Sequence, residues 1–352
     1  MRLLLTAVLL LTPVFAQTRE TGEINGAQFL IEMPETWNGT LLVYCHGYSG
    51  APGRFNSEKP SAFSVLTQTG AAVIQSGYAA GGWAIEEAVN DTQALVRHFV
   101  AKHGKPKQVY VFGHSMGGFL TMTLLEKFPT TYHGGLALCG PLAPASWFMT
   151  RHPFDYRVVF DYYFPGELPP PDQVPAEYKG GAEESARILA LLDRNEAKAA
   201  EVRRFSMIKN NKDLAGTLVF FTLILQELQQ RAGGSAFGNR STVYQGTSDD
   251  NALNDGVKRY DADARAAEYL HRFYTPNGRL TRPMLAIHTT YDPLIPAAVP
   301  NYYADLAARA GSGHLFSQRY VKADGHCTIP VGEIVRGLLD VQRWAQEGQG
   351  PR

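Results

Sequence analysis

Short apolar runs alternate with longer amphipathic segments over two parts of the chain. Many of the runs contain β-branched or aromatic residues, a composition that is typical of strands covered on both faces. These runs occupy residues 41–45, 71–75, 108–112, 135–140, 284–288 and 316–321. In the segments between them, apolar residues recur at helical spacing. The helices expected there cover residues 83–102, 119–128, 301–310 and 331–346.

Strands that alternate with helices along a chain form βαβ units. The pattern therefore predicts an α/β fold, with a mostly parallel twisted sheet flanked by helices. Residues 17–40 differ, because a Pro-Glu-Thr-Trp-Asn-Gly turn follows the apolar run at 29–33. Such spacing favours antiparallel strands at the start of the sheet.

The alternation stops at about residue 141 and resumes at about residue 282. The intervening segment is rich in helix-favouring residues over 182–205, 215–231 and 261–273. It begins with a cluster of aromatic residues: Trp147, Phe148, Phe154, Tyr156, Phe160, Tyr162, Tyr163 and Phe164. We expect residues 142–281 to form a helical cap or lid, inserted between strands 6 and 7. Residues 17–141 and 282–352 would then form the core domain, since one compact core is usually smaller than this chain.

The first sixteen residues have the pattern of a signal peptide. A short basic start, Met1-Arg2, precedes an apolar stretch at 3–11, and 14–16 end it in a small-x-small cleavage pattern. This stretch is too short to cross a bilayer, which takes ~20 residues, and so is the apolar segment 218–225. We expect residues 1–16 to be removed, no stable membrane insertion, and a secreted or periplasmic protein.

Composition and charge exclude several classes of function. A hydrophobic content of 45% with 19% charged residues excludes a disordered chain. The formal net charge is +0 and the basic residues are scattered, so we expect no nucleic-acid partner. Because no His-Glu-x-x-His or paired Cys-x-x-Cys spacing occurs, we expect no metal and no other cofactor. These features leave the oligomeric state open.

The sequence Gly113-His114-Ser115-Met116-Gly117-Gly118 follows a predicted strand and opens a predicted helix. A Gly-x-Ser-x-Gly sequence in that order is typical of a nucleophile elbow, in which a sharp turn exposes a serine hydroxyl. Glycine on both sides removes the Cβ atoms that would clash in such a turn. The pattern predicts a nucleophilic Ser115; the alternative is a tight strand-to-helix turn with a passive serine.

A serine hydroxyl becomes a good nucleophile when a base takes its proton and a third group orients that base. Asp292 follows the strand at 284–288, and His326 follows the last strand. Asp324, two residues before the histidine, is the rival acid. The other histidines considered are expected to be structural: His46, His114, His288 and His314.

In this order of serine, acid and histidine, the chain resembles the α/β-hydrolase superfamily over residues 29–141 and 282–346. The resemblance implies that Ser115 attacks a carbonyl, that His326 is general base and then general acid, and that Asp292 holds the imidazole in one tautomer. Within the superfamily the chain resembles exported bacterial serine esterases and prolyl-oligopeptidase-like hydrolases.

Acyl transfer also needs N–H groups that face the oxygen on which charge develops. We expect one from the backbone of Met116, the residue after the nucleophile. For the second we favour the backbone N–H of Tyr48, after the strand at 41–45, with Gly47 as the next choice. The His46-Gly47 pair is equally compatible with an ordinary tight turn.

The three cysteines, Cys45, Cys139 and Cys327, all lie at or beyond the ends of predicted strands. In an exported protein this odd number predicts one disulfide and one buried thiol. We favour Cys139–Cys327, since Cys327 follows His326 and Cys139 ends a central strand; Leu138-Cys139-Gly140 and Gly325-His326-Cys327 also resemble a subset of exported bacterial α/β-hydrolases. A Cys45–Cys327 disulfide is the alternative.

These residues predict a secreted serine hydrolase that cleaves a carboxylic ester, with a small-molecule or short acyl substrate. We expect Trp83, Tyr78 and Trp147 to bind an apolar or aromatic acyl group, although such rings could equally form the core beneath the cap. A prolyl-oligopeptidase-like serine peptidase is the alternative, in which Glu183 and Glu184 could bind an α-amino group. A catalytically inactive binding protein is a third hypothesis, disfavoured because the whole triad is present.

Overall fold

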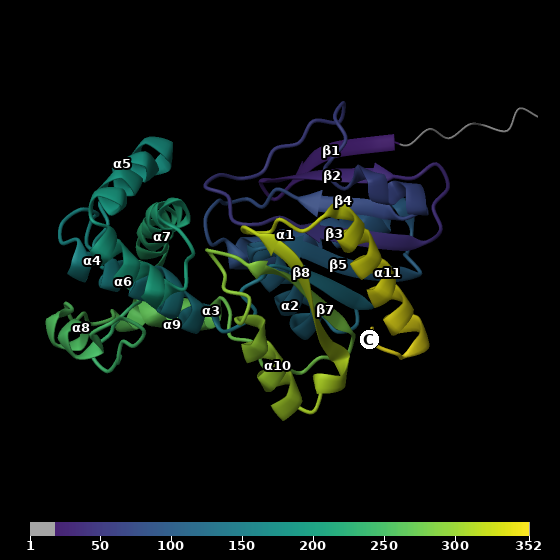
Figure 1. The fold of residues 1–352 in the computed structure, drawn as a ribbon. Helices are drawn as coiled ribbons and strands as arrows, with labels where there is room; N and C mark the ends of the chain where they lie inside the picture. Colours follow the sequence, from purple (N-terminus) through teal and green to yellow (C-terminus); the bar gives the residue numbers. More distant parts are fainter. Residues whose placement is uncertain (1–17, 352) are drawn as a thin grey trace, which may run out of the picture.

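In the computed structural model, which describes residues 18–351, eight strands form a single sheet that is flanked by helices (Figure 1). The strands are β1 (Thr18–Ile24), β2 (Ala27–Met33), β3 (Thr40–Cys45), β4 (Ala72–Ser76), β5 (Gln108–His114), β6 (Gly134–Leu138), β7 (Met284–Tyr291) and β8 (Phe316–Asp324). Across the sheet their order is β1-β2-β4-β3-β5-β6-β7-β8.

The sheet is antiparallel at one edge and parallel elsewhere. β2 pairs antiparallel with both β1 and β4, whereas all the other neighbouring strands are parallel. The predicted α/β class, the mostly parallel sheet and the antiparallel start are therefore confirmed. Because β5, β6, β7 and β8 run in the same direction, the loops that follow them meet at one edge of the sheet.

Each face of the sheet has its own core, since successive strand residues point to opposite sides. Val43 belongs to the core that α1 (Ile85–His103) and α2 (Met116–Lys127) close, and the adjacent Leu42 belongs to the core that α11 (Val331–Glu347) closes. Both residues are almost fully buried. Three further elements complete this part of the chain: η1 (Ser64–Thr69), α10 (Pro300–Arg309) and η3 (Gly313–Leu315).

Between β6 and β7 the chain forms a group of helices beside the sheet, which we call the helical block (Figure 1). Its elements are α3 (Ala145–Met149), the π-helical turn η2 (Thr150–Phe154), α4 (Asp155–Tyr163), α5 (Gly181–Arg194), α6 (Glu196–Ser206), α7 (Asn211–Ala232), α8 (Asp250–Gly256) and α9 (Ala264–Arg272). Its helices include the three expected stretches. That residues 142–281 are a separate cap domain stays a prediction.

Two details of the helical block differ from the pattern prediction. The helix-favouring stretch at 182–205 forms two helices, α5 and α6, which are divided at Asn195. The side-chain amide of Asn195 donates to the carbonyl oxygen of Leu191 at 2.9 Å, and such side-chain contacts compete with helical backbone bonds. The aromatic cluster forms short helical elements. They were not predicted, because aromatic residues have a weak helix propensity.

The predicted signal peptide at 1–16 lies outside the described residues. Within residues 18–351, no helix combines the length and the apolar character needed to span a membrane. The apolar segment 218–225 is part of α7.

Candidate active site

Ser115 sits in a sharp turn between β5 and α2. Its backbone has φ 56° and ψ −121°, a conformation that L-residues rarely adopt outside functional sites. The turn packs directly on β3: a Cβ added at Gly113 would lie 2.5 Å from the carbonyl oxygen of Cys45, and one added at Gly117 would lie 1.9 Å from it. Only glycine fits at both positions, which explains the Gly-x-Ser-x-Gly spacing.

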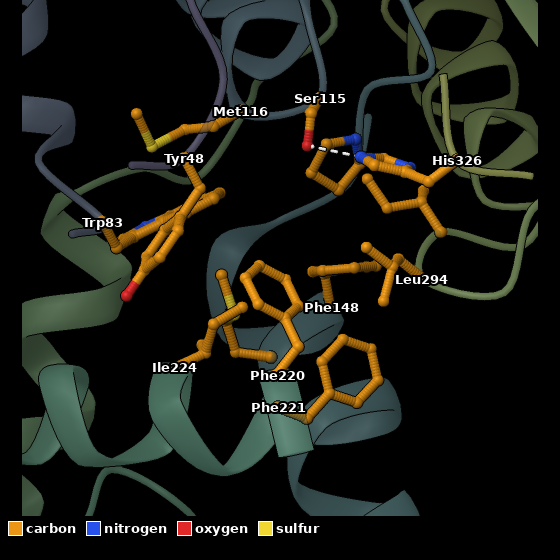
Figure 2. Close-up of a pocket in the computed structure, with 13 residues that line it drawn as sticks. Tyr48, Trp83, Ser115, Met116, Phe148, Phe220, Phe221, Ile224, Leu294 and His326 are labelled. Carbon is orange, nitrogen blue, oxygen red and sulfur yellow. Dashed lines mark hydrogen bonds between the residues drawn. The ribbon is translucent and has the colours of Figure 1, made fainter. Parts of the chain in front are cut away.

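The loops after β7 and β8 bring an acid and a histidine to this serine. Nε2 of His326 lies 2.9 Å from Oγ of Ser115 (Figure 2). On the other side of the ring, Nδ1 of His326 lies 2.7 Å from Oδ2 of Asp292. The three side chains thus form a continuous hydrogen-bonded chain. In the tautomer with its proton on Nδ1, the imidazole donates to the carboxylate and its Nε2 accepts from the serine hydroxyl.

Asp292 is buried and fully hydrogen-bonded. Its Oδ1 accepts from the backbone N–H groups of Leu294 at 2.9 Å and Ile295 at 3.0 Å. Its Oδ2 also lies 3.5 Å from Nε2 of His288. Burial alone would raise the pKa of Asp292, but hydrogen bonds from His288, His326 and the backbone outweigh it and hold the pKa well below its usual value. The carboxylate therefore stays ionised beside the imidazole.

Asp324, the rival acid, lies elsewhere. Its carboxylate is exposed and is ion-paired with Nζ of Lys209 at 2.9 Å. The structure thus brings Asp292, and not Asp324, to His326.

Met116 and Tyr48 both line the cavity that contains Ser115. Met116 is the first residue of α2, where backbone N–H groups have no partner within the helix. A Cβ added at Gly47 would lie 3.3 Å from Cβ and 3.9 Å from Oγ of Ser115, so the loop before Tyr48 passes directly beside the serine. This close approach explains why a glycine precedes Tyr48.

A mostly apolar cavity opens at Ser115 and His326 (Figure 2). It has an empty volume of about 350 Å³ that includes its mouth. Besides these two residues, its lining consists of Tyr48, Trp83, Met116, Pro141, Phe148, Met149, Phe220, Phe221, Ile224, Leu294 and Ile295. Residues outside and inside the helical block both contribute walls, and α7 supplies Phe220, Phe221 and Ile224.

Of the three expected substrate-binding residues, only Trp83 lines this cavity. Tyr78 is fully buried, with its ring stacked on His46 at 3.9 Å and its hydroxyl donating to the carbonyl oxygen of His46 at 3.3 Å. Trp147 packs against Tyr302, with ring centroids 5.2 Å apart. Neither ring belongs to the described cavity lining; both serve as packing, the alternative considered from the sequence.

Sequence reasoning missed several residues of the cavity wall, chiefly Phe220, Phe221, Ile224 and Leu294. The helical spacing in α7 predicts that one face is buried, but it does not say against what. Phe148 belongs to the aromatic cluster noted in the sequence, which together with Trp83 gave a sequence signal for the wall.

Cys139 and Cys327 form a disulfide, with Cα atoms 5.4 Å apart, whereas Cys45 is a buried free thiol. The structure thus has the favoured pairing and not the alternative. Cys139 directly follows β6, and Cys327 directly follows His326, so the bond ties the histidine loop to the sheet. Within the described chain, Cys139, Cys327 and His326 are the one group close enough to surround a metal ion, but the disulfide leaves them no thiolate ligand.

The sequence pattern of the alpha/beta hydrolase fold family matches residues 40–328, and the chain belongs to this family. An o-phthalyl amidase of Xanthobacter agilis is 24% identical over 127 residues, which cover 35% of this chain and 27% of that protein.

Two of the solved structures that share the fold illustrate the similarity. An esterase/lipase from an uncultured bacterium has a TM-score of 0.50 and 14% identity, covering 94% of this chain and 84% of that one. A Mycobacterium tuberculosis puromycin-hydrolyzing peptidase has a TM-score of 0.50 and 12% identity, covering 97% of this chain and 41% of that one. This chain therefore spans well under two thirds of the amidase and of the peptidase.

Proposed function

We propose that this protein is a secreted serine hydrolase that cleaves carboxylic esters through an acyl-enzyme. The observation that carries this proposal is the contact of one imidazole with two partners: His326 reaches Oγ of Ser115 through Nε2 and the carboxylate of Asp292 through Nδ1. A serine so placed is ready to lose its proton to a neutral, oriented base.

In the first half-reaction, Oγ of Ser115 bonds to the ester carbonyl carbon while its proton passes to Nε2 of His326. The carbonyl oxygen becomes an oxyanion, which the backbone N–H groups of Met116 and Tyr48 stabilise, at about 3–4 kcal/mol for each donor. The intermediate then collapses, the bond to the alkoxide oxygen breaks, and the imidazolium of His326 protonates the leaving alcohol.

In the second half-reaction, water attacks the acyl-enzyme and His326 takes a proton from it. The second tetrahedral intermediate expels Oγ of Ser115, which recovers its proton from the imidazolium. The products are the carboxylic acid and the free enzyme. Asp292 remains ionised throughout and stabilises the imidazolium that forms in each half-reaction.

The cavity favours an ester with an apolar acyl group. Its described walls are aromatic and aliphatic side chains, and none carries a carboxylate or an ammonium group that could hold a peptide terminus. Glu183 and Glu184 do not provide such a carboxylate, because they lie in the first turn of α5 and are not part of the cavity lining. Glu184 is also paired with Arg187 at 2.9 Å. An ester whose acyl group carries no charge fits such a surface best.

Amide cleavage is the second candidate, because the Xanthobacter agilis relative is named as an o-phthalyl amidase. The test is labelling with a fluorophosphonate, followed by comparison of p-nitrophenyl esters with aminoacyl and peptidyl p-nitroanilides. We expect one label, lost in Ser115→Ala, and turnover of esters alone. Preferred turnover of anilides would support the peptidase, and no labelling at all would contradict a serine hydrolase.

We further propose that the protein acts outside the cytoplasm, with residues 1–16 removed and 142–281 serving as a cap. The disulfide between Cys139 and Cys327 supports this, since such bonds persist in oxidising compartments. Intact-mass measurement of the protein recovered from culture medium or periplasm tests the cleavage. A mass that includes residues 1–16 would contradict it.

A further inference from the structure

An ion-paired glutamate on α7 contacts the segment that supports the loop of Tyr48. Oε2 of Glu227 accepts the backbone N–H of Trp83 at 3.0 Å. Its other oxygen lies against Gly82, where an added Cβ would be 2.1 Å from Oε1. Glycine at this position therefore leaves room for the carboxylate.

Arg231, one turn further along α7, completes a clamp. Its Nε donates to Glu227 at 2.6 Å, its Nη1 to Glu87 at 2.9 Å and its Nη2 to the carbonyl oxygen of Gly81 at 2.7 Å. Each of the three guanidinium nitrogens thus donates a hydrogen bond. Both side chains are mostly buried, with 22% exposure for Glu227 and 17% for Arg231, so the pair is shielded from much of the solvent screening that weakens surface ion pairs.

The clamped segment holds the proposed oxyanion loop. The backbone N–H of Gly82 donates to the carbonyl oxygen of Ser49 at 2.7 Å, in an isolated antiparallel bridge. Ser49 directly follows Tyr48, whose N–H is the proposed second oxyanion donor. The same helix α7 presents Phe220, Phe221 and Ile224 to the cavity. One rigid helix therefore joins the acyl-group wall to the support of the oxyanion loop.

We infer that Glu227, together with Arg231, is a positioning residue that fixes the backbone N–H of Tyr48 for the reaction; this inference rests on the proposed function. Glu227 does not itself line the cavity, and it meets the cavity wall through the backbone N–H of Trp83. It acts through Trp83, Gly82 and Ser49. A small displacement of an oxyanion donor lowers the rate strongly, because the donor must face the oxyanion. Loss of this clamp therefore lowers kcat more than it raises KM.

The experiment compares Glu227→Ala with Glu184→Ala. Glu184 is a suitable control, because it is also paired with an arginine in the helical block and its side chain is 23% exposed, but its hydrogen bonds and ion pair are with Arg187 and not with residues 81–83. We expect Glu227→Ala to lower kcat by roughly 10- to 100-fold, with KM changed by less than about 2-fold. The rate of fluorophosphonate labelling should fall in parallel, because the phosphonyl oxygen uses the same donors. Glu184→Ala should leave both rates unchanged.

Glu227→Gln keeps an acceptor for the N–H of Trp83 but loses the charge that faces Arg231. It should recover only part of the lost kcat and remain more than about 2-fold below wild type, so it serves as the test if Glu227→Ala fails to fold. A kcat within about 2-fold of wild type in every Glu227 variant that folds, an equal loss in Glu184→Ala, or a loss carried by KM would each overturn the inference. Failure of the wild-type protein to react with the fluorophosphonate would instead overturn the proposed function, and this inference with it.

Discussion

Oδ2 of Asp292 lies 2.7 Å from Nδ1 of His326, although the two residues are carried by the loops after different strands. This contact selects the tautomer in which Nε2 is free to accept the proton of Ser115. Replacing Asp292 by asparagine preserves the size of the side chain, but its amide nitrogen can donate to Nδ1 and stabilise the wrong tautomer.

We therefore expect Asp292→Asn to lose roughly 10⁴-fold in kcat on the best p-nitrophenyl ester. Asp324→Asn is the matched control, because Asp324 pairs with Lys209 at the surface. Steady-state kinetics of both variants decide the matter. A large loss of kcat in Asp324→Asn, with Asp292→Asn close to wild type, would show that Asp324 and not Asp292 is the acid of the triad.

The stability contributed by the Asp292 carboxylate should depend on pH. Its pKa is lowered in the folded protein, so its contribution is fully present above the pKa of the unfolded state, about 3.9, and is lost as the pH falls towards the folded value. Urea unfolding of wild type and Asp292→Asn between about pH 7 and pH 3 measures this. The difference in unfolding free energy should stay level above about pH 5 and change in favour of the variant below about pH 4. A difference that is constant over the whole range would contradict the pKa direction.

The disulfide should stabilise the fold and the histidine loop together. It joins residues that are 188 apart in sequence, for which chain entropy gives an upper figure of roughly 5 kcal/mol. We expect the double variant Cys139→Ser/Cys327→Ser to lose up to this much unfolding free energy, and to lose kcat because His326 is less firmly held. A reductant should have the same effect on wild type and none on the double variant. Unchanged kcat in a destabilised double variant would restrict the disulfide to a purely structural role.

Phe220 should limit the length of the acyl group. It lines the cavity and meets Tyr48 edge to face, with ring centroids 5.5 Å apart. Truncation to alanine should open the wall and shift preference towards longer chains, by roughly 10-fold in the ratio of kcat/KM for octanoyl over butyryl esters. Phe205→Ala provides the control, since Phe205 is a half-buried ring of the helical block that packs on Tyr156 and Tyr244. An unchanged chain-length profile in Phe220→Ala would remove this residue from the acyl site.

Local signals carried most of what the sequence could predict. The turn at Ser115 is specified by its immediate neighbours, because Gly113 and Gly117 are demanded by the approach of the Cys45 carbonyl. Asp292 and His326 could be placed because parallel strands deliver their following loops to one edge of the sheet. At these positions the requirements are the tight turn at Ser115 and the shared edge of the parallel strands. Each depends on few residues, so it can be recognised in the sequence.

The cavity wall could not be predicted in the same way. In the sequence, Phe220 and Tyr78 are both aromatic residues that are expected to be buried. In the structure, Phe220 lines the cavity, whereas Tyr78 stacks on His46. Which apolar side chain meets a space and which meets another side chain depends on the placement of the whole helical block. Hydrophobic spacing carries no information on that placement.

The proposed catalytic side chains and the cavity walls that surround them come from different parts of the architecture. Ser115, Asp292 and His326 are rooted in loops of the sheet, whereas five cavity residues, Phe148, Met149, Phe220, Phe221 and Ile224, belong to the helical block. Exchange of those five side chains would change which molecules are accepted while the bond-breaking apparatus stays intact. A single scaffold of this kind can thus be retuned to new compounds by engineering one contiguous stretch of the gene.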